Sequence, residues 1–272
     1  MDLSQMKSII DSAYESQAPL NQAAQNVVRE TIRLLDEGKI RVAEPQGLQW
    51  EVHEWIKKAV LLYFKIQGLI RMEIGPFEFY DKIPLKKNFE QFRVRVVPPG
   101  VARYGSYLAP GVVLMPGYVN IGAYVDSNTM IDTHATVGSC AQVGKRVHLA
   151  GAARIGGVLE PPQSRPVIVE DDVFVGSAVS VLEGMIVRKE AVLGAGVILT
   201  GSTRIIDVSA SQTIEYRGEI PERSVVIPGT YEKEFPAGKF HVQCALIIGK
   251  RKESTDKKVS LNEVLRDFNI SI

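Results

Sequence analysis

The stretch from residue 101 to residue 155 carries an apolar residue at every sixth position, and this rhythm limits the folds open to the chain. A fixed short period is the mark of a repeat architecture. After an interruption at residues 157–166, the rhythm resumes two residues out of phase and continues to Ile205. The apolar positions are Val101, Tyr107, Val113, Val119, Val125, Ile131, Val137, Val143, Leu149 and Ile155, then Val169, Val175, Val181, Val187, Leu193, Leu199 and Ile205.

A period of six matches neither an α-helix nor a flat amphipathic strand, which repeat at 3.6 and 2 residues. It fits a very short strand followed by a corner, with three such units making one triangular coil. The aliphatic residue would point inward, and a small residue four positions later, such as Gly105, Gly111 or Ala123, would let the corner turn. Stacked coils would lie about 4.8 Å apart, the ordinary spacing between strands. The sequence therefore predicts a mainly β protein built as a parallel β-helix rather than a sandwich.

The composition narrows the classes of function. The 272 residues are 45% hydrophobic and 23% charged, with a formal net charge of +1, as expected of a globular protein. This balance leaves no excess of positive charge for nucleic acid, and no apolar run reaches the ~18 residues of a membrane span. Cys140 and Cys244 provide no disulfide framework, and the N-terminus lacks the pattern of a signal peptide. We therefore expect a cytoplasmic protein with neither nucleic-acid nor membrane partners.

Residues 1–95 lack the hexad rhythm and are expected to form a mostly helical N-terminal domain. Apolar spacing favours helices near residues 3–13, 21–37 and 49–67, the second ending at Gly38. Lys57 and Lys58 are expected on a solvated helix face. The stretch 73–90, rich in Pro, Lys and Phe, is expected to be a loop.

Residues 96–229 form the predicted β-helix, and residues 230–272 form a small C-terminal extension. The insertion at 157–166 is long for a turn, which favours a functional loop, and we expect it to project toward a neighbouring chain. A strand is predicted over residues 240–249. Ser260 should cap a final helix that carries Leu261 and Phe268 on one face.

Several motifs together resemble one enzyme family, the tetrahydrodipicolinate N-succinyltransferases of the lysine and diaminopimelate pathway. The resemblance covers nearly the whole chain and is dense between residues 93 and 172. It is carried by the segments Lys58–Leu62, Arg95–Pro99, Val119–Asp126, Thr129–Thr133, Ala135–Gly144, Val147–Leu149, Ile155–Pro161 and Val169–Asp171. It implies a left-handed β-helix of hexapeptide repeats and transfer of a succinyl group from succinyl-CoA, without a metal. It also implies a homotrimer with active sites between subunits.

The resemblance also implies roles for particular residues. Arg95 would bind the dicarboxylic substrate, since a guanidinium pairs with a carboxylate through two parallel hydrogen bonds. Asp132 would bind or activate the amine, although an aspartate at a corner can also simply bond its own backbone. A second acidic residue of the family is replaced here by Ser180, so Glu183 is a candidate for that role. His134 stands where the family often has tryptophan.

Weaker signals concern the coenzyme. Ala195 and Gly196 are small enough for a pantetheine arm to pass and to bond their backbone. Lys250 and Arg251 are candidates for the CoA phosphates, and a solvated tail is the other interpretation of these two residues. Catalysis would need a proton acceptor and backbone N–H groups for the oxyanion, with no covalent enzyme intermediate.

Other functions stay open on the sequence. One alternative is another hexapeptide-repeat N- or O-acyltransferase that uses acetyl-CoA and a histidine base, for which His134 and His148 are available. A metal hydratase would need three histidines from neighbouring coils, and of four histidines His53 and His241 lie outside the main repeat. A non-catalytic β-helix scaffold is the third alternative. A sugar nucleotidyltransferase is disfavoured because no Gly-rich nucleotide-binding segment precedes the repeat.

Overall fold

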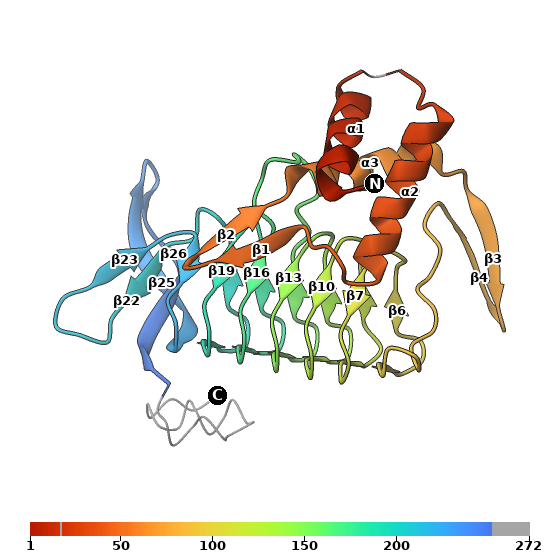
Figure 1. Ribbon diagram of the computed structural model, residues 1–272. Coiled ribbons are helices and arrows are strands. Elements are labelled where there is room, and N and C mark those ends of the chain that lie inside the picture. The colour runs from red at the N-terminus through yellow and green to blue at the C-terminus, as the bar shows by residue number, and fades with distance from the viewer. Residues whose placement is uncertain (17, 252–272) are drawn as a thin grey trace.

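The hexads fold into a three-sided prism of parallel strands, seen edge-on in Figure 1. This is a computed structural model that describes residues 1–16 and 18–251. Most strands of the prism are two residues long, and each pairs with the strand one coil away. Met130, for example, pairs with His148, which lies 18 residues later. The helix predicted after Ser260 lies outside the described residues.

The three sheets of the prism are called here the helix-facing sheet, which packs against the helices, the capped sheet, which continues into the long C-terminal strands, and the third sheet. The helix-facing sheet contains β7 (Tyr107–Leu108), β10 (Tyr124–Val125), β13 (Gln142–Val143), β16 (Ile168–Val169), β19 (Ile186–Val187) and β24 (Glu219–Ile220). The capped sheet contains β5 (Arg95–Val96), β8 (Val113–Leu114), β11 (Met130–Ile131), β14 (His148–Leu149), β17 (Phe174–Val175) and β20 (Val192–Leu193). The third sheet contains β6 (Val101–Ala102), β9 (Tyr118–Val119), β12 (Thr136–Val137), β15 (Arg154–Ile155), β18 (Ser180–Val181) and β21 (Ile198–Leu199).

The inward columns are those that the hexads predict from Val119 onward. Val119, Val125, Ile131, Val137 and Val143 all have 0% exposure and belong to one continuous core. Burying an aliphatic side chain of this kind stabilises the fold by roughly 1.5–3 kcal/mol. The stacked aliphatics therefore supply the main driving force for the coils.

The first coil differs from the prediction by one residue. Ala102, Leu108 and Leu114 point inward there, while Val101 and Tyr107 lie on the outer surface. The assignment of Val101, Tyr107 and Val113 to the interior was therefore wrong. Only five residues separate Leu114 from the next inward residue, Val119, which shifts the phase by one.

The N-terminal region contains three helices, α1 (Leu3–Glu15), α2 (Gln22–Asp36) and α3 (Glu54–Ile66). Asp2 caps α1 in a capping box, and Asn21 accepts a hydrogen bond from the Ala24 N–H at the start of α2. Gly38 follows α2 with φ +69°, and a Cβ there would lie 2.6 Å from the Tyr107 ring. The predicted end of the second helix at Gly38 is thus confirmed. Glycine suits this position because its φ is left-handed and because the Tyr107 ring leaves no room for a side chain.

Two hairpins in this region were not predicted. The hairpin β1 (Ala43–Gln46) to β2 (Gln49–Val52) takes the residues expected to begin the third helix, which starts only at Glu54. The hairpin β3 (Ile70–Ile74) to β4 (Phe77–Asp81) forms where a loop was expected. It turns at Gly75 and Pro76 and projects from the prism in Figure 1.

The helical region packs on the helix-facing sheet of the prism. The Arg41 guanidinium lies 3.7 Å from the centroid of the Tyr124 ring, and its Nε donates to Gln142 Oε1 at 3.1 Å. Tyr124 and Gln142 are outward residues of the helix-facing sheet. The helical core also includes Ile121 and Cys140, which lie at corners of the prism. The burial of Cys140 raises the pKa of its thiol to about 12.

The insertion at 157–166 packs against the helical region of its own chain. Lys57 of α3 is 0% exposed and donates to the Ser164 carbonyl at 2.7 Å and the Pro161 carbonyl at 3.4 Å. Leu159 packs against the helical core. The expectation of a solvated Lys57 was therefore wrong, while Lys58 pairs with Asp11 at 2.9 Å. Burial lowers the pKa of Lys57 from its ordinary value.

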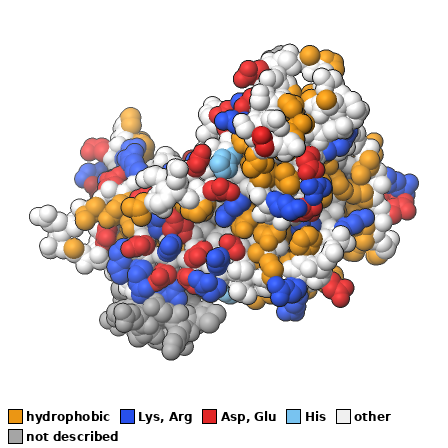
Figure 2. Space-filling model, viewed as in Figure 1, with side chains coloured by type: hydrophobic (Ala, Val, Ile, Leu, Met, Phe, Trp, Pro, Cys, Tyr) orange, Lys and Arg blue, Asp and Glu red, His pale blue; other side chains and the backbone are white. Residues whose placement is uncertain are grey.

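Long strands close the far end of the prism. The capped sheet continues through β25 (Ser224–Phe235), β26 (Gly238–Lys250), β22 (Ile205–Asp207) and β23 (Ile214–Tyr216). The start of β25 pairs in parallel with β20, which confirms the predicted last partial coil, and β26 confirms the strand predicted over 240–249. The boundary expected after Gly229 falls inside β25. Figure 2 shows acidic and basic side chains intermingled on the face viewed, in keeping with the net charge of +1.

Candidate active site

The prism has three edges where the chain turns from one sheet to the next, and they carry different side chains. The covered edge, between the third and helix-facing sheets, holds Ile121, Cys140, the insertion and Glu183. The charged edge, between the helix-facing and capped sheets, holds Lys145–Arg146, Asp171–Asp172, Lys189–Glu190 and Glu222–Arg223. The bare edge, between the capped and third sheets, holds Thr133–His134, Gly151–Ala152, Ser177–Ala178 and Ala195–Gly196.

Asp132 opens the bare edge directly after β11. Its Oδ1 accepts hydrogen bonds from the Thr133 N–H at 2.6 Å and the Thr133 hydroxyl at 3.2 Å. This is the local bonding expected of a corner aspartate. It uses one carboxylate oxygen and fixes the plane of the carboxylate, so the second oxygen, Oδ2, is directed elsewhere. About a third of the side chain, 33%, is exposed.

His148 provides the group that Asp132 Oδ2 faces, and sequence reasoning missed this partner. His148 Nε2 lies 3.8 Å from Asp132 Oδ2, and 28% of the His148 side chain is exposed. The ring lies beside that of Phe174, with centroids 5.1 Å apart. A signal was present in the sequence, because the 18-residue coil step places His148 over Met130, two residues before Asp132. The structure thus gives His148 an acidic neighbour that is distant from it in the sequence.

Arg95 lies on β5 in the first coil of the same sheet. It pairs with Val113, which pairs with Met130, so Arg95 is two rungs from the strand that ends in Asp132. At the ordinary strand spacing this is about 10 Å along the column. Arg95 is exposed. A long guanidinium side chain and a dicarboxylic ligand together span such a distance.

Glu183 lies on the covered edge, away from Asp132. Its Oε2 accepts a hydrogen bond from the Gly201 N–H at 3.0 Å, and its φ of +52° fits a corner position. Ser180, at the position of the missing acidic residue, is a buried residue of the third sheet beside Arg154. Within one chain the structure therefore brings neither Glu183 nor Ser180 to the Asp132–His148 pair.

Ala195 and Gly196 lie on the bare edge, three coils beyond Asp132. Each corner hydrogen-bonds to the one below it through the backbone: the Ala152 N–H donates to the Thr133 carbonyl, Ala178 to Gly151, and Gly196 to Ser177, at 2.9–3.0 Å. Ala152, Ala178 and Gly196 are exposed. The result is a shallow backbone track that runs from Asp132 to Gly196 along one edge.

Lys250 and Arg251 lie on the charged edge and are held by the corners there. Lys250 Nζ donates to the Glu222 carbonyl at 2.7 Å and to Ser224 Oγ at 3.2 Å. Arg251 Nη1 donates to the Asp172 carbonyl at 3.0 Å. The two residues therefore do not form a loose tail, and they lie on the opposite margin of the capped sheet from Ala195 and Gly196.

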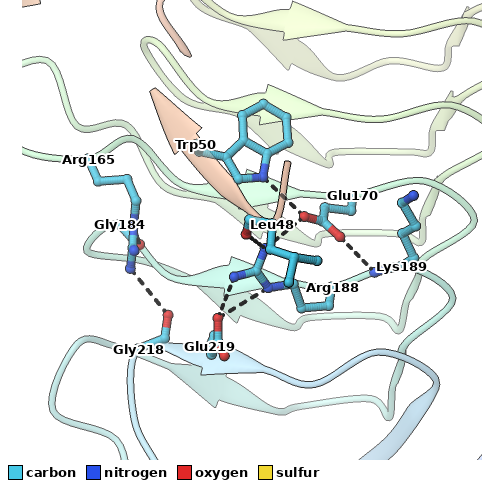
Figure 3. Close-up of polar contacts among 9 residues, drawn as sticks. All are labelled: Leu48, Trp50, Arg165, Glu170, Gly184, Arg188, Lys189, Gly218 and Glu219. Carbon is cyan, nitrogen blue, oxygen red and sulfur yellow. Dashed lines mark hydrogen bonds and ion pairs between the residues drawn. The ribbon is translucent and has the colours of Figure 1, made fainter. Parts of the chain in front are cut away.

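A polar network on the helix-facing side holds the β1–β2 hairpin against the prism (Figure 3). The Trp50 Nε1–H donates to Glu170 Oε1 at 3.0 Å. Arg188 donates to Glu170 at 3.1 Å, to the Leu48 carbonyl at 3.0 Å and to Glu219 at 2.7 Å. Charge-assisted bonds of this kind are stronger than neutral ones. They fix the covering of the helix-facing sheet.

A hollow of about 300 Å³ adjoins the start of the bare edge. Its residues come from the first three strands of the third sheet and the adjoining corners, and include His134, Tyr118 and Pro99. His134 has φ +59° and is exposed. His134 thus borders this hollow and lies two residues after Asp132 in the sequence.

Within residues 1–16 and 18–251, no group of three or more His, Cys, Asp or Glu side chains is arranged to hold a metal ion. In the same residues, none of the helices is both long and apolar enough to span a bilayer. Cys140 and Cys244 are both buried free thiols.

Comparison with known sequences gives a consistent result along the chain. Residues 5–66 match the family model described as tetrahydrodipicolinate N-succinyltransferase N-terminal, and residues 166–201 match the hexapeptide repeat of succinyl-transferase. Three relatives carry the name 2,3,4,5-tetrahydropyridine-2,6-dicarboxylate N-succinyltransferase. The Ehrlichia ruminantium protein is 48% identical over 98% of this chain and 97% of its own. The Albidiferax ferrireducens protein is 49% identical over 97% and 99%, and the Coxiella burnetii protein 49% over 97% and 100%.

Proposed function

Because this chain belongs to the family of tetrahydrodipicolinate N-succinyltransferases, we propose that it transfers a succinyl group from succinyl-CoA to the amine of ring-opened tetrahydrodipicolinate. The observation that carries the proposal is identity near one half over almost the full length of both chains. Such identity includes the prism and the helical region alike. The reaction would belong to diaminopimelate and lysine biosynthesis.

The proposed reaction is a direct attack of the amine nitrogen on the thioester carbonyl. The amine must lose its proton as the N–C bond forms, and a positioned carboxylate can accept it. We assign this role to Asp132, because its Oδ1 is fixed by Thr133 while Oδ2 faces outward toward His148. The oxyanion would be stabilised by backbone N–H groups at a corner.

Substrate recognition would rest on Arg95. Its side chain is exposed on the outer face of the capped sheet, on the column that leads to Asp132. A guanidinium fork binds a carboxylate through two parallel hydrogen bonds. The substrate carries two carboxylates, so one can pair with Arg95 while the amine reaches Asp132.

The coenzyme would lie along the bare edge, with the pantetheine arm passing Ala195 and Gly196. The exposed backbone and small side chains of this edge support the assignment, since a ligand can approach the main chain closely only where no side chain intervenes. Lys250 and Arg251 would contribute charge to the CoA phosphates from the other margin of the capped sheet. Both side chains donate hydrogen bonds to backbone carbonyl groups at this edge, which holds the two cations close to the sheet.

We further propose a homotrimer of left-handed prisms, in the cytoplasm, with each site between two chains. Asp132 and Glu183 lie on different edges of one chain, so both could serve one site only if a second copy supplied Glu183. Exposed apolar wall residues would also be buried between copies.

The test is an assay of CoA release with purified protein, tetrahydrodipicolinate and either succinyl-CoA or acetyl-CoA. We expect turnover with succinyl-CoA and at least ten-fold lower kcat/KM with acetyl-CoA. Equal or better use of acetyl-CoA would favour a different acyltransferase, and absence of any transfer would favour a scaffold. Mass spectrometry of the product would establish which nitrogen is acylated.

A further inference from the structure

We propose that His148 is a second proton acceptor of the site and contacts the reacting amine together with Asp132. This inference rests on the proposed function and adds a catalytic residue to it. The observation behind it is the placement of an imidazole nitrogen 3.8 Å from the carboxylate oxygen that its own corner does not use.

The distance between the two acceptors suits a shared ligand. At 3.8 Å, His148 Nε2 and Asp132 Oδ2 are too far apart for a direct hydrogen bond. A single nitrogen can lie about 3 Å from both atoms at once, within hydrogen-bond reach of each. An amine bound there would donate one proton to the carboxylate and a second proton to the imidazole.

The surroundings hold both acceptors in position. Thr133 fixes Asp132 through its N–H and its hydroxyl. The His148 ring has Met130 and Phe174 as its neighbours one coil below and one coil above, and Asp132 is the carboxylate that faces it. Both side chains are about one-third exposed, so a substrate can reach them from solvent.

The proton balance of the reaction needs two acceptors. An alkylammonium group first loses one proton to expose its lone pair. The nitrogen then bonds to the thioester carbonyl carbon, the C–S bond breaks, CoA leaves as a thiolate, and the nitrogen loses its second proton. One of the two protons ends on the sulfur of CoA and the other in solvent. Asp132 and His148 can take one each, and the imidazole can pass its proton to the leaving thiolate.

The experiment compares His148→Gln with His53→Gln. His53 makes a similar pair with a carboxylate, its Nε2 lying 3.4 Å from Glu44 Oε2, but it precedes α3, far from the bare edge in the sequence. We expect H148Q to lower kcat by about 10²-fold or more, with the KM for succinyl-CoA unchanged, and H53Q to match the wild type. His148→Asn is the second variant should H148Q fail to fold, as judged by thermal melting.

The pH profile separates a chemical role from a structural one. If His148 accepts a proton from the amine, its removal should change the dependence of kcat/KM on pH, whereas H53Q should keep the wild-type profile. A folded H148Q with full activity, or with reduced activity and an unchanged pH profile, would overturn the role of His148 but not the proposed function. A wild-type protein that releases no CoA overturns the proposed function, and this role with it.

Discussion

The bare edge and the charged edge of the prism share one backbone and differ in almost every side chain. The third residue of each corner has a left-handed φ on both edges: Ala152 and Ala178 on the bare edge have φ near +59° and +56°, and Arg146 and Asp172 on the charged edge +54° and +60°. On the charged edge, side chains tie one coil to the next. Arg146 donates to both oxygens of Asp172, at 2.7 and 2.6 Å.

The bare edge stacks its coils with backbone hydrogen bonds alone. The comparison therefore teaches that side-chain ties between corners are not required for stacking, and that an edge without them exposes main chain to a ligand. If this view is right, changes on the bare edge should affect activity. Matched changes at corner residues of the charged edge, apart from the proposed CoA-binding residues Lys250 and Arg251, should affect stability at most.

The largest effect should come from Asp132→Asn, which keeps the shape of the side chain and removes the base. We expect kcat to fall by about 10²–10⁴-fold, measured by CoA release. Asp126→Asn is the matched control, because Asp126 Oδ1 accepts the Ser127 N–H at 2.7 Å at the charged edge, as Asp132 does from Thr133. Equal losses in the two variants would show that the corner bond, and not the chemistry, matters.

The next effect should come from Ala195→Leu on the bare edge. An isobutyl group there should obstruct the proposed pantetheine track and raise the KM for succinyl-CoA at least ten-fold. Lys189→Leu is the counterpart on the charged edge, since Lys189 holds the same place in its corner. An unchanged KM in A195L would move the coenzyme away from this edge.

The covered edge offers a smaller effect through Lys57→Met. Loss of the donor leaves the Ser164 and Pro161 carbonyls without it, which should lower the free energy of unfolding by about 1 kcal/mol at neutral pH. Because burial lowers the pKa of Lys57 in the folded chain, the unfolded chain holds more protons between that pKa and the ordinary lysine value. Wild-type stability should therefore rise with pH across this alkaline window.

The K57M variant should lose that part of the slope. Urea unfolding from neutral to alkaline pH would measure it, and parallel curves for the wild type and K57M would contradict the expectation. Activity should change little, because Lys57 lies on α3 against the insertion and away from the bare edge.

The smallest effect should come from Arg146→Ala on the charged edge. Both partners of the Arg146–Asp172 pair are more than one-third exposed, so solvent screens the pair and its contribution should be about 0.2–1 kcal/mol. The difference in unfolding free energy between wild type and R146A should shrink in high salt. A ten-fold loss of activity in this variant would break the distinction between the two edges.

The hexad pattern predicted the prism because an apolar residue recurs at the inward second position of each two-residue strand. It failed in the first coil, where Val113 and Leu114 are adjacent and both apolar, so periodicity alone could not choose between them. A step of five residues decided for Leu114. In the N-terminal region, Trp50 and Val52 fitted a helical face equally well, and only pairing with β1 shows that they belong to a strand.

For the site, sequence reasoning placed Asp132 at a corner and chose Ala195 and Gly196 for their small size, and the coil geometry brings all three to one edge. It did not find His148 beside Asp132, although the 18-residue step contained that information. The inward burial of Lys57 had no local signal, since its partners are carbonyl groups of an insertion more than 100 residues away.

The hairpin of β25 and β26 has a consequence for how copies of this chain can meet. A stack of parallel rungs is, in principle, a template on which the next identical rung can settle, and regular edges of this kind invite open-ended growth. Here the capped sheet changes direction after β25, since β25 continues the parallel stack beside β20 but β26 runs antiparallel to β25 and is followed in the sheet by β22 and β23. The strands at this end of the prism therefore do not match the first strands of a second copy in direction and register. Lengthwise polymerisation is discouraged, and contact between copies is diverted to the flanks of the prism.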